Sequence, residues 1–261
     1  MKGDSNPLRR FPGTAAAGWL FLAYLYLPLI ILIVLSFNAN RSATIWTGFS
    51  FDWYFAILKN EQILIAARNS LIIAVTATIA STIIATLAAL AMAARFRGEN
   101  AANLVMALPL VVPEIITAVA SLLFFSLLGW KLGLTTVLIA HTVFCIPFAY
   151  LPIRARLEGM DKTLKEAAND LYANHWWTFY RVTLPLLWPG VISGAMLAFI
   201  ISLDDFVITS FVAGAGSNTL PIYIYTSIRI GISPEVNAIS SVMLVISVIF
   251  VSVSYLIGRK R

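Results

Sequence analysis

Long apolar runs separated by short polar segments dominate the chain. Runs such as residues 71–75 are continuously apolar and lack the alternation of apolar and polar positions that a membrane-spanning β-strand requires. A helix needs roughly 20 apolar residues to cross a ~30 Å hydrocarbon core. Six stretches reach that length: residues 16–37, 66–94, 104–128, 134–153, 188–211 and 238–258. The pattern predicts an all-α integral membrane protein with about six transmembrane helices, organised as a single transmembrane domain over residues 1–261.

Composition and charge agree with this prediction. The chain is 60% hydrophobic and 11% charged, whereas a soluble domain carries about a quarter charged residues. Its net charge is +6, and the placement of the basic residues explains this without a nucleic-acid partner. With both termini in the cytoplasm, 13 of the 18 basic residues lie inside: Lys2, Arg9, Arg10, Arg95, Arg97, Arg154, Arg156, Lys162, Lys165, Arg181, Arg259, Lys260 and Arg261.

Several classes of protein and site are excluded by what the sequence lacks. The single cysteine, Cys145, rules out an internal disulfide and a cysteine zinc cluster, and we expect it to be a small buried side chain in the fourth span. No Gly-rich phosphate loop is present, so ATP is not expected to bind this chain. The first apolar run is longer than a signal-peptide core and has no clear cleavage site, which predicts an uncleaved first span.

One outer loop and one span carry further local signals. The outer segment 38–65 is rich in aromatic residues, which favours an interfacial belt with a short helix on the outer face. Pro109 and Pro113 remove backbone donors from the third span and predict a kink there.

The inner loop, predicted over residues 154–187, contains a helix signature. Thr163 is expected to be the N-cap of a capping box with Glu166. An apolar stripe follows at helical spacing, formed by Leu164, Ala167, Ala168 and Leu171. So short a helix cannot bury this stripe within its own loop, so it lies on the membrane, packs under the bundle or docks into a partner.

Three acids fall inside predicted spans: Glu114, Asp204 and Asp205. Each costs roughly 2.5–3.5 kcal/mol at a helix centre, and no lysine or arginine shares their spans at a pairing distance. Such acids line a water-filled path, or else hydrogen-bond a neighbouring helix or cap a broken one. Adjacent residues on a helix point about 100° apart. Only one of the aspartates is therefore expected to face a path, and we choose Asp204.

Other polar and aromatic residues give weaker evidence about a path through the membrane. Tyr223, Tyr225 and Trp130 are candidates to stack on a cation in the path, with anchoring at the membrane interface as the alternative. His141 is expected to be a hydrogen-bonded structural residue. No histidine, cysteine or carboxylate group has the spacing of a metal site.

Several motifs resemble one family. Glu166-Ala167-Ala168, followed by Asp170-Leu171 and, about 17 residues on, by Leu184-Pro185, is similar to the EAA loop of ABC-importer permeases. Further segments resemble the spermidine/putrescine branch: residues 108–114, 202–209, 219–221 and 229–238.

The resemblance implies a type I ABC-importer permease fold in the bacterial inner membrane. It also implies that a cytoplasmic coupling helix contacts an ATPase subunit through Leu164, Glu166, Ala167, Ala168, Asp170, Leu171 and Tyr172. The implied substrates are polyamines, with a path lined by Glu114, Asp204, Asp205, Tyr223 and Tyr225. The implied partners are a second related permease, two ATP-binding subunits that hold ATP and magnesium, and an extracytoplasmic binding protein.

One position departs from the family pattern. The family usually has glycine where this chain has Tyr172, and glycine there supplies the left-handed turn that ends the helix. Because tyrosine is strained in that conformation, the turn is expected to move to Asn174.

Three alternatives stay open from the sequence. The same fold importing another solute, such as an opine or organophosphonate, is the nearest. A proton-coupled carrier also uses isolated membrane acids but needs no docking helix. An intramembrane aspartyl protease needs two aspartates on different helices, whereas Asp204 and Asp205 are neighbours on one.

Overall fold

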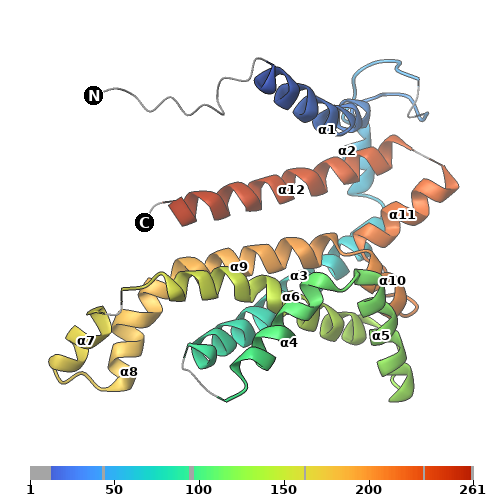
Figure 1. Cartoon of the computed structure of the whole chain (residues 1–261). Helices are drawn as coiled ribbons and strands as arrows, with labels where there is room; N and C mark the ends of the chain where they lie inside the picture. The colour runs from blue at the N-terminus through green and yellow to red at the C-terminus, as the bar shows by residue number, and fades with distance from the viewer. Residues whose placement is uncertain (1–12, 43–44, 94–96, 162, 232, 260–261) are drawn as a thin grey trace, which may run out of the picture. The chain divides into compact units, whose positions relative to one another are not determined.

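The computed structural model describes residues 13–42, 45–93, 97–161, 163–231 and 233–259, and most of them are helical (Figure 1). In chain order the helices are α1 (Thr14–Ser36), α2 (Asp52–Ile57), α3 (Glu61–Met92), α4 (Glu99–Val111), α5 (Glu114–Leu127), α6 (Leu134–Glu158), α7 (Thr163–Asp170), α8 (His175–Thr178), the π-helix η2 (Phe179–Thr183), α9 (Leu184–Asp204), α10 (Val207–Val212), α11 (Leu220–Ile230) and α12 (Pro234–Arg259). The all-α prediction is confirmed.

Five described helices or continuous helical stretches are long and apolar enough to cross a membrane, and α4 with α5 makes up to six. The third predicted span is broken: α4 and α5 meet at a bend of 107°. The break falls at Pro113, because a proline excludes the preceding residue from helical geometry, and Val112 is extended with ψ 132°. Pro109 stays inside α4. The predicted kink is therefore a break at one of the two prolines.

The fifth span also differs from its predicted bounds. It starts earlier, because α8, η2 and α9 run continuously from His175 to Asp204. It also ends earlier, since α9 stops at Asp204 and α10 is a separate short helix, so the predicted single span over 188–211 is wrong at both ends. With α6 reaching Glu158, the inner loop between the long helices shortens to residues 159–174.

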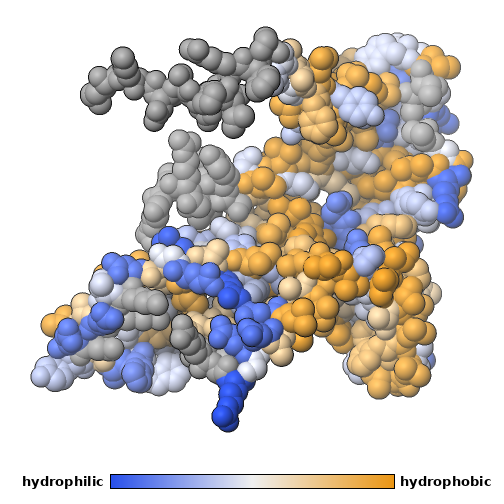
Figure 2. Space-filling model, in the orientation of Figure 1, coloured by the Kyte–Doolittle hydropathy of each residue, from blue (hydrophilic) through white to orange (hydrophobic). Residues whose placement is uncertain are grey.

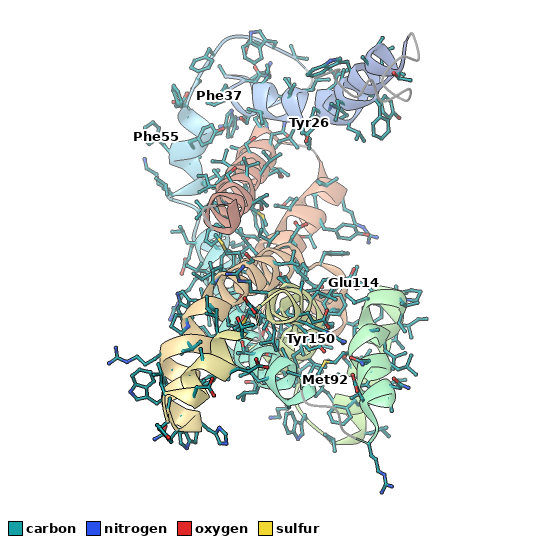
Figure 3. The ribbon with its side chains drawn as sticks, turned by 60° about the vertical axis from the view of Figure 1, so that its left-hand side comes forward. Tyr26, Phe37, Phe55, Met92, Glu114 and Tyr150 are labelled. Atoms are coloured by element: carbon teal, nitrogen blue, oxygen red, sulfur yellow. The ribbon has the colours of Figure 1, made fainter. Side chains whose placement is uncertain are left out.

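The chain divides into two compact units, residues 1–59 with 227–243 and residues 60–226 with 244–261. In the first unit the buried Asn38 organises the loop after α1. Its amide donates to the carbonyls of Ser42 and Ile45, and its backbone oxygen accepts from the Trp53 indole. The ring of Phe37 stacks on Phe49 at 5.1 Å (Phe37 is labelled in Figure 3). The short helix expected in this aromatic segment is α2.

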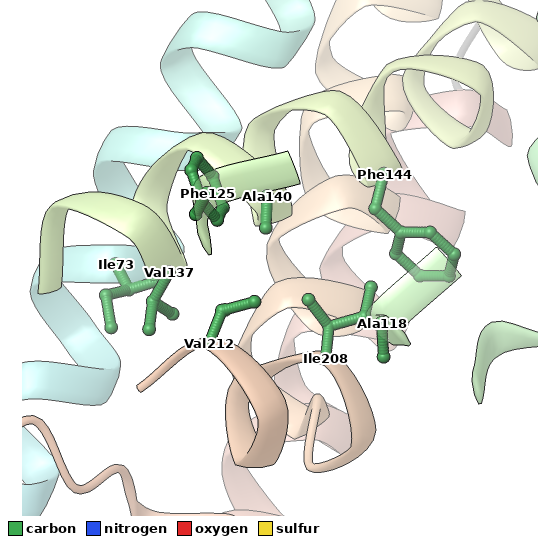
Figure 4. Close-up of a cluster of buried hydrophobic side chains, with 8 residues drawn as sticks. All are labelled: Ile73, Ala118, Phe125, Val137, Ala140, Phe144, Ile208 and Val212. Atoms are coloured by element: carbon green, nitrogen blue, oxygen red, sulfur yellow. The ribbon is translucent and has the colours of Figure 1, made fainter. Parts of the chain in front are cut away.

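In the second unit α3, α6 and α9 pack against one another. Small residues allow α9 to approach α6 closely: a Cβ at Gly194 would lie 2.5 Å from the Ala149 carbonyl oxygen. Cys145 is fully buried here, as predicted, with its thiol 3.6 Å from the Ala198 carbonyl. A cluster of buried hydrophobic side chains joins α3, α5, α6 and α10: Ile73, Ala118, Phe125, Val137, Ala140, Phe144, Ile208 and Val212 (Figure 4).

Candidate functional site

The three membrane acids meet where two spans are interrupted. Glu114 is in the first turn of α5, directly after the proline break, where a helix N-terminus favours a carboxylate (Figure 3). Asp204 is the last residue of α9, and Asp205 lies in the gap before α10. The Glu114 carboxyl lies close enough to Asp205 and Asp204 to interact with both. Residues about 90 positions apart in the sequence thus form one acidic site.

The two adjacent aspartates have different surroundings. Asp205 is 6% exposed, whereas Asp204 is exposed and makes no hydrogen bond or ion pair that the described residues show. Asp205 Oδ1 accepts hydrogen bonds from the Thr209 N–H at 2.8 Å and from the Thr209 hydroxyl at 2.9 Å. From the position before the N-cap residue Phe206, Asp205 therefore caps the first turn of α10, one of the two structural roles weighed for these acids from the sequence.

A histidine from a different helix completes this arrangement. His141, on α6, places Nε2 3.2 Å from Asp205 Oδ1 and 2.8 Å from the Thr209 hydroxyl. Its Nδ1 lies 2.8 Å from the Ser202 hydroxyl on α9. The His141 and Asp205 side chains are each 2% exposed. Nε2 must carry hydrogen because it faces a carboxylate oxygen, and Nδ1 can then accept from Ser202.

The expectation that His141 is hydrogen-bonded is confirmed, but its pairing with Asp205 was missed. The two residues are 64 positions apart and lie on different spans, so no local spacing connects them. A histidine alone in an apolar span was the only available signal, since a buried polar group needs a partner.

The other end of α10 is also fixed by α6. The Thr136 hydroxyl donates to the Val212 carbonyl at 2.7 Å, which satisfies a carbonyl at the end of the helix. Beyond α10, the Asn69 amide on α3 donates to the Asn218 carbonyl at 2.9 Å. The segment that follows Asp205 is thus held by polar contacts to α3 and α6.

Of the two candidate tyrosines, Tyr225 lies against the break. Its ring is 4.4 Å from that of Phe206, the residue after Asp205, and it is 39% exposed. Tyr223 is half-buried on α11. Trp130 stacks on Phe125 at 5.9 Å.

The predicted coupling residues lie on α7 and the turn after it. The stripe formed by Leu164, Ala167, Ala168 and Leu171 lines an apolar groove of about 530 Å³, which α8 and η2 complete with Trp177 and Val182. Ala168 is buried, whereas Leu171 is 82% exposed. Glu166 and Asp170 are exposed. Hydrophilic residues gather around α7 in the space-filling view, in contrast to the apolar cover of α5 (Figure 2).

The predicted capping box is wrong. Helix α7 already includes Thr163, and the capping acceptor is Asp161, whose carboxylate accepts from the Thr163 N–H at 2.9 Å. This bond holds the pKa of Asp161 below its ordinary value. A threonine and a glutamate three residues apart match the motif, but the aspartate two residues upstream takes the capping role.

The expected shift of the turn to Asn174 is also wrong. Tyr172 itself adopts the left-handed conformation, with φ 58°, and is alone among the described non-glycine residues in doing so. The Ala173 N–H donates to the Ala168 carbonyl at 3.1 Å, which is the bond of a Schellman turn. Asn174 instead caps α8, accepting from the Trp177 N–H at 2.7 Å.

The acidic site has the chemistry to receive an organic cation. Its carboxylates are hydrogen-bond acceptors, and an ammonium group carries only donors. Acids inside a membrane protein commonly mark the path of a substrate or ion. No group of three or more histidine, cysteine or acidic residues in the described ranges is arranged to hold a metal ion.

Comparisons with known proteins agree on one family. A family model described as "Binding-protein-dependent transport system inner membrane component" matches residues 81–260. The spermidine/putrescine transport system permease protein PotC of Escherichia coli (strain K12) is 40% identical over 240 residues, which cover 92% of this chain and 91% of PotC. The putrescine transport system permease protein PotI of the same strain is 38% identical over 249 residues, 92% of this chain and 89% of PotI.

A solved structure gives the same fold. One chain of a bacterial ABC transporter involved in the import of the acidic polysaccharide alginate matches with a TM-score of 0.73 at 17% identity. The match covers 95% of this chain and 93% of that one.

Proposed function

Because the chain belongs to the binding-protein-dependent transport system inner membrane components, we propose that it is a permease subunit of an ABC importer that takes up polyamines. It is a multi-pass inner-membrane protein and not itself an enzyme. ATP and magnesium bind the partner ATPase subunits, and a periplasmic binding protein delivers the substrate. The proton-coupled carrier considered from the isolated acids finds no support in the comparisons.

The observation that carries the choice of substrate is the acidic site at the two helix breaks, in a chain 40% identical to a spermidine/putrescine permease. Putrescine and spermidine are extended chains with several ammonium groups. Moving such a cation from water into a membrane channel is costly, and fixed carboxylates along the path offset that cost.

The surroundings of each acid suggest different roles. Asp204 is exposed within this chain and is free to meet an ammonium group, while Asp205 is occupied by the α10 cap. Glu114 is half-buried at the start of α5 and adds a second carboxylate to the site. Tyr225, beside Phe206, offers an aromatic face to the alkyl chain or ammonium groups of the substrate, and Tyr223 is the further candidate on the same helix.

Helix α7 is the proposed contact for the ATPase. Its neighbours expose large apolar side chains, including Leu171 at 82% and Tyr172 at 98%. Large apolar side chains exposed next to one another on a hydrophilic part of the surface are typical of a site that binds a partner. Glu166 and Asp170 add charge to the same element. Motion of the ATPase against this element is how hydrolysis on one subunit would reach a channel formed by another.

The channel is proposed to lie between two permease subunits, with this chain and a second, related permease forming a heterodimer. Many apolar side chains of the described helices are exposed in the single chain, such as Leu127 at 87%. Lipid and a second subunit together would cover them.

Uptake of radiolabelled putrescine and spermidine into a deletion strain complemented with this chain tests the proposal. We expect uptake to be restored by the wild-type chain. Asp204→Asn should reduce it about tenfold, because it removes a charge that pairs with the substrate. Unchanged uptake in the deletion strain would end the polyamine assignment, and competition by an unlabelled opine or organophosphonate would identify the alternative substrate class.

The coupling assignment needs its own test. Glu166→Arg reverses the charge of an exposed residue on α7, and we expect it to lower co-purification of the ATPase subunit. Glu158→Arg is the control: Glu158 is an exposed acid at the end of α6, outside the proposed contact, and its reversal also breaks its surface ion pair with Arg154. Equal recovery of the ATPase with both variants would contradict the assignment.

A further inference from the structure

The break between α9 and α10 has no backbone cause in its own sequence. Residues 203–207 contain neither proline nor glycine, the two residue types that most often interrupt a helix. Yet α9 ends at Asp204, and Asp205 is extended with φ −62° and ψ 121°. Side-chain contacts therefore hold the chain in this conformation: the local bonds from Thr209 to Asp205, and contacts from another helix.

The side chain of His141 contacts the chain on both sides of the break. Its Nδ1 bonds Ser202 in the last turn of α9, and its Nε2 faces Asp205 in the gap and Thr209 in α10. These contacts are buried, so water does not compete for them. Because His141 belongs to α6, these hydrogen bonds link the break to a neighbouring helix.

The alternative conformation is a helix that continues from α9 into α10. In it, residues 207 and 208 would lie three and four positions after Asp204 and so on the same face as its side chain. The apolar side chains of Val207 and Ile208 would then lie beside the carboxylate that is now exposed and cover part of it. The continuous helix would also withdraw Asp205 and Thr209 from His141, leaving buried polar groups without partners.

We propose that His141 is a positioning residue that holds the break between α9 and α10 through Ser202, Asp205 and Thr209, and thereby keeps the Asp204 carboxylate uncovered. His141 touches no substrate in this scheme and acts through the helix break. Its importance for transport rests on the proposed function, but the conformational claim does not.

Thiol labelling measures the exposure of position 204 directly. The native Cys145 is fully buried, so the unmodified chain supplies the background and Asp204→Cys the signal. The assembled importer in lipid nanodiscs is treated with a cationic, water-soluble methanethiosulfonate reagent, and the rate of modification of this subunit is followed. Lys131→Cys, an exposed position in the turn before α6, is the matched control for general integrity.

Single substitutions test the individual hydrogen bonds of His141. In the Asp204→Cys background, His141→Phe removes both ring nitrogens, and we expect labelling to slow about threefold or more because the covered conformation gains population. His141→Gln keeps a donor at the place of Nε2 and should label at close to the parent rate. Thr209→Val should slow labelling, whereas Thr209→Ser, which keeps the hydroxyl, should not.

Two results would overturn the proposal. One is an unchanged labelling rate in His141→Phe with the complex intact. The other is faster labelling at both position 204 and position 131, which would mean that the histidine only stabilises the fold. If His141→Phe fails to assemble, the Thr209→Val and Thr209→Ser pair decides.

Polyamine uptake is a second measurement, and it can fail independently of the labelling experiment. His141→Phe in the otherwise native chain should raise the KM for polyamine uptake, with rescue by His141→Gln. Slowed labelling together with an absence of polyamine uptake in the wild-type chain would leave the positioning role standing and remove the substrate assignment.

Discussion

The two interrupted spans of this permease are broken by different means. Between α4 and α5 the cause is local: Pro113 forces Val112 out of the helical conformation, and the chain bends by 107°. Between α9 and α10 the sequence alone would allow a continuous helix, and a buried network around His141 and Asp205 interrupts it. The first break is fixed by covalent geometry, and the second depends on how α6 packs.

This difference bears on function because the two breaks bring the acids together. A proline break persists however the neighbouring helices move. A break held by hydrogen bonds from another helix can respond when α6 and α9 shift against each other. The acidic site thus has one rigid side, at Glu114, and one side that depends on tertiary contacts, at Asp204.

The largest effect is expected from changing the distance between α6 and α9. Gly194→Leu would force a side chain into the Ala149 backbone, where even a Cβ has only 2.5 Å, and would move His141 away from its partners. We expect a loss of about 3 kcal/mol or more of stability, seen as poor assembly and a lower thermal unfolding midpoint. Gly18→Leu is the control, because a Cβ at Gly18 meets nothing within 4 Å. Equal unfolding midpoints would show that the close approach is not required.

The next effect distinguishes the two adjacent aspartates. Asp205→Ala removes the α10 cap and leaves the Thr209 N–H and His141 without their acceptor, which should cost about 2–4 kcal/mol. Asp204→Ala should change stability by less than about 0.5 kcal/mol, since Asp204 is exposed, while still reducing uptake. Thermal unfolding of both variants, measured beside uptake, tests this division. A stability loss from Asp204→Ala as large as that from Asp205→Ala would contradict the assignment of a structural role to Asp205 alone.

A smaller effect should follow from removing the local cause of the first break. Pro113→Ala allows the helical hydrogen bonds of α4 to continue into α5, so we expect the angle between the two helices to open. Spin labels at the exposed positions 105 and 123 report this as a longer distance, with the buried Cys145 unlabelled. Pro109→Ala is the matched control, because Pro109 lies inside α4, and should leave the distance unchanged.

The same contrast explains what could be predicted from the sequence. The long apolar runs and Pro113 act locally, so the helical fold, the approximate number of membrane spans and an interruption near Pro113 were correctly predicted, whereas the bounds of the fifth span were not. The α9–α10 break was not, because it depends on a histidine 64 residues away. The three acids were found as charges out of place in apolar spans, but their meeting at two helix breaks needed the tertiary structure. The capping box failed for a smaller reason: a nearby aspartate competed for the same role.

The smallest effect concerns the turn after α7, which is held neither by proline nor by a buried network. Tyr172 adopts φ 58° while it is 98% exposed, so packing against the described residues does little to offset the strain. Tyr172→Gly should therefore raise local stability by about 1 kcal/mol. Slower hydrogen exchange of the Ala173 amide, which closes the turn, is the measurement. Asn174→Gly is the contrast: Asn174 has φ −71° and caps α8, so glycine there removes the cap and should destabilise. If Asn174→Gly stabilises the loop and Tyr172→Gly does not, the left-handed residue is at position 174, as the strain of tyrosine predicts. Backbone preference would then decide the position of this turn, as it decides the break at Pro113.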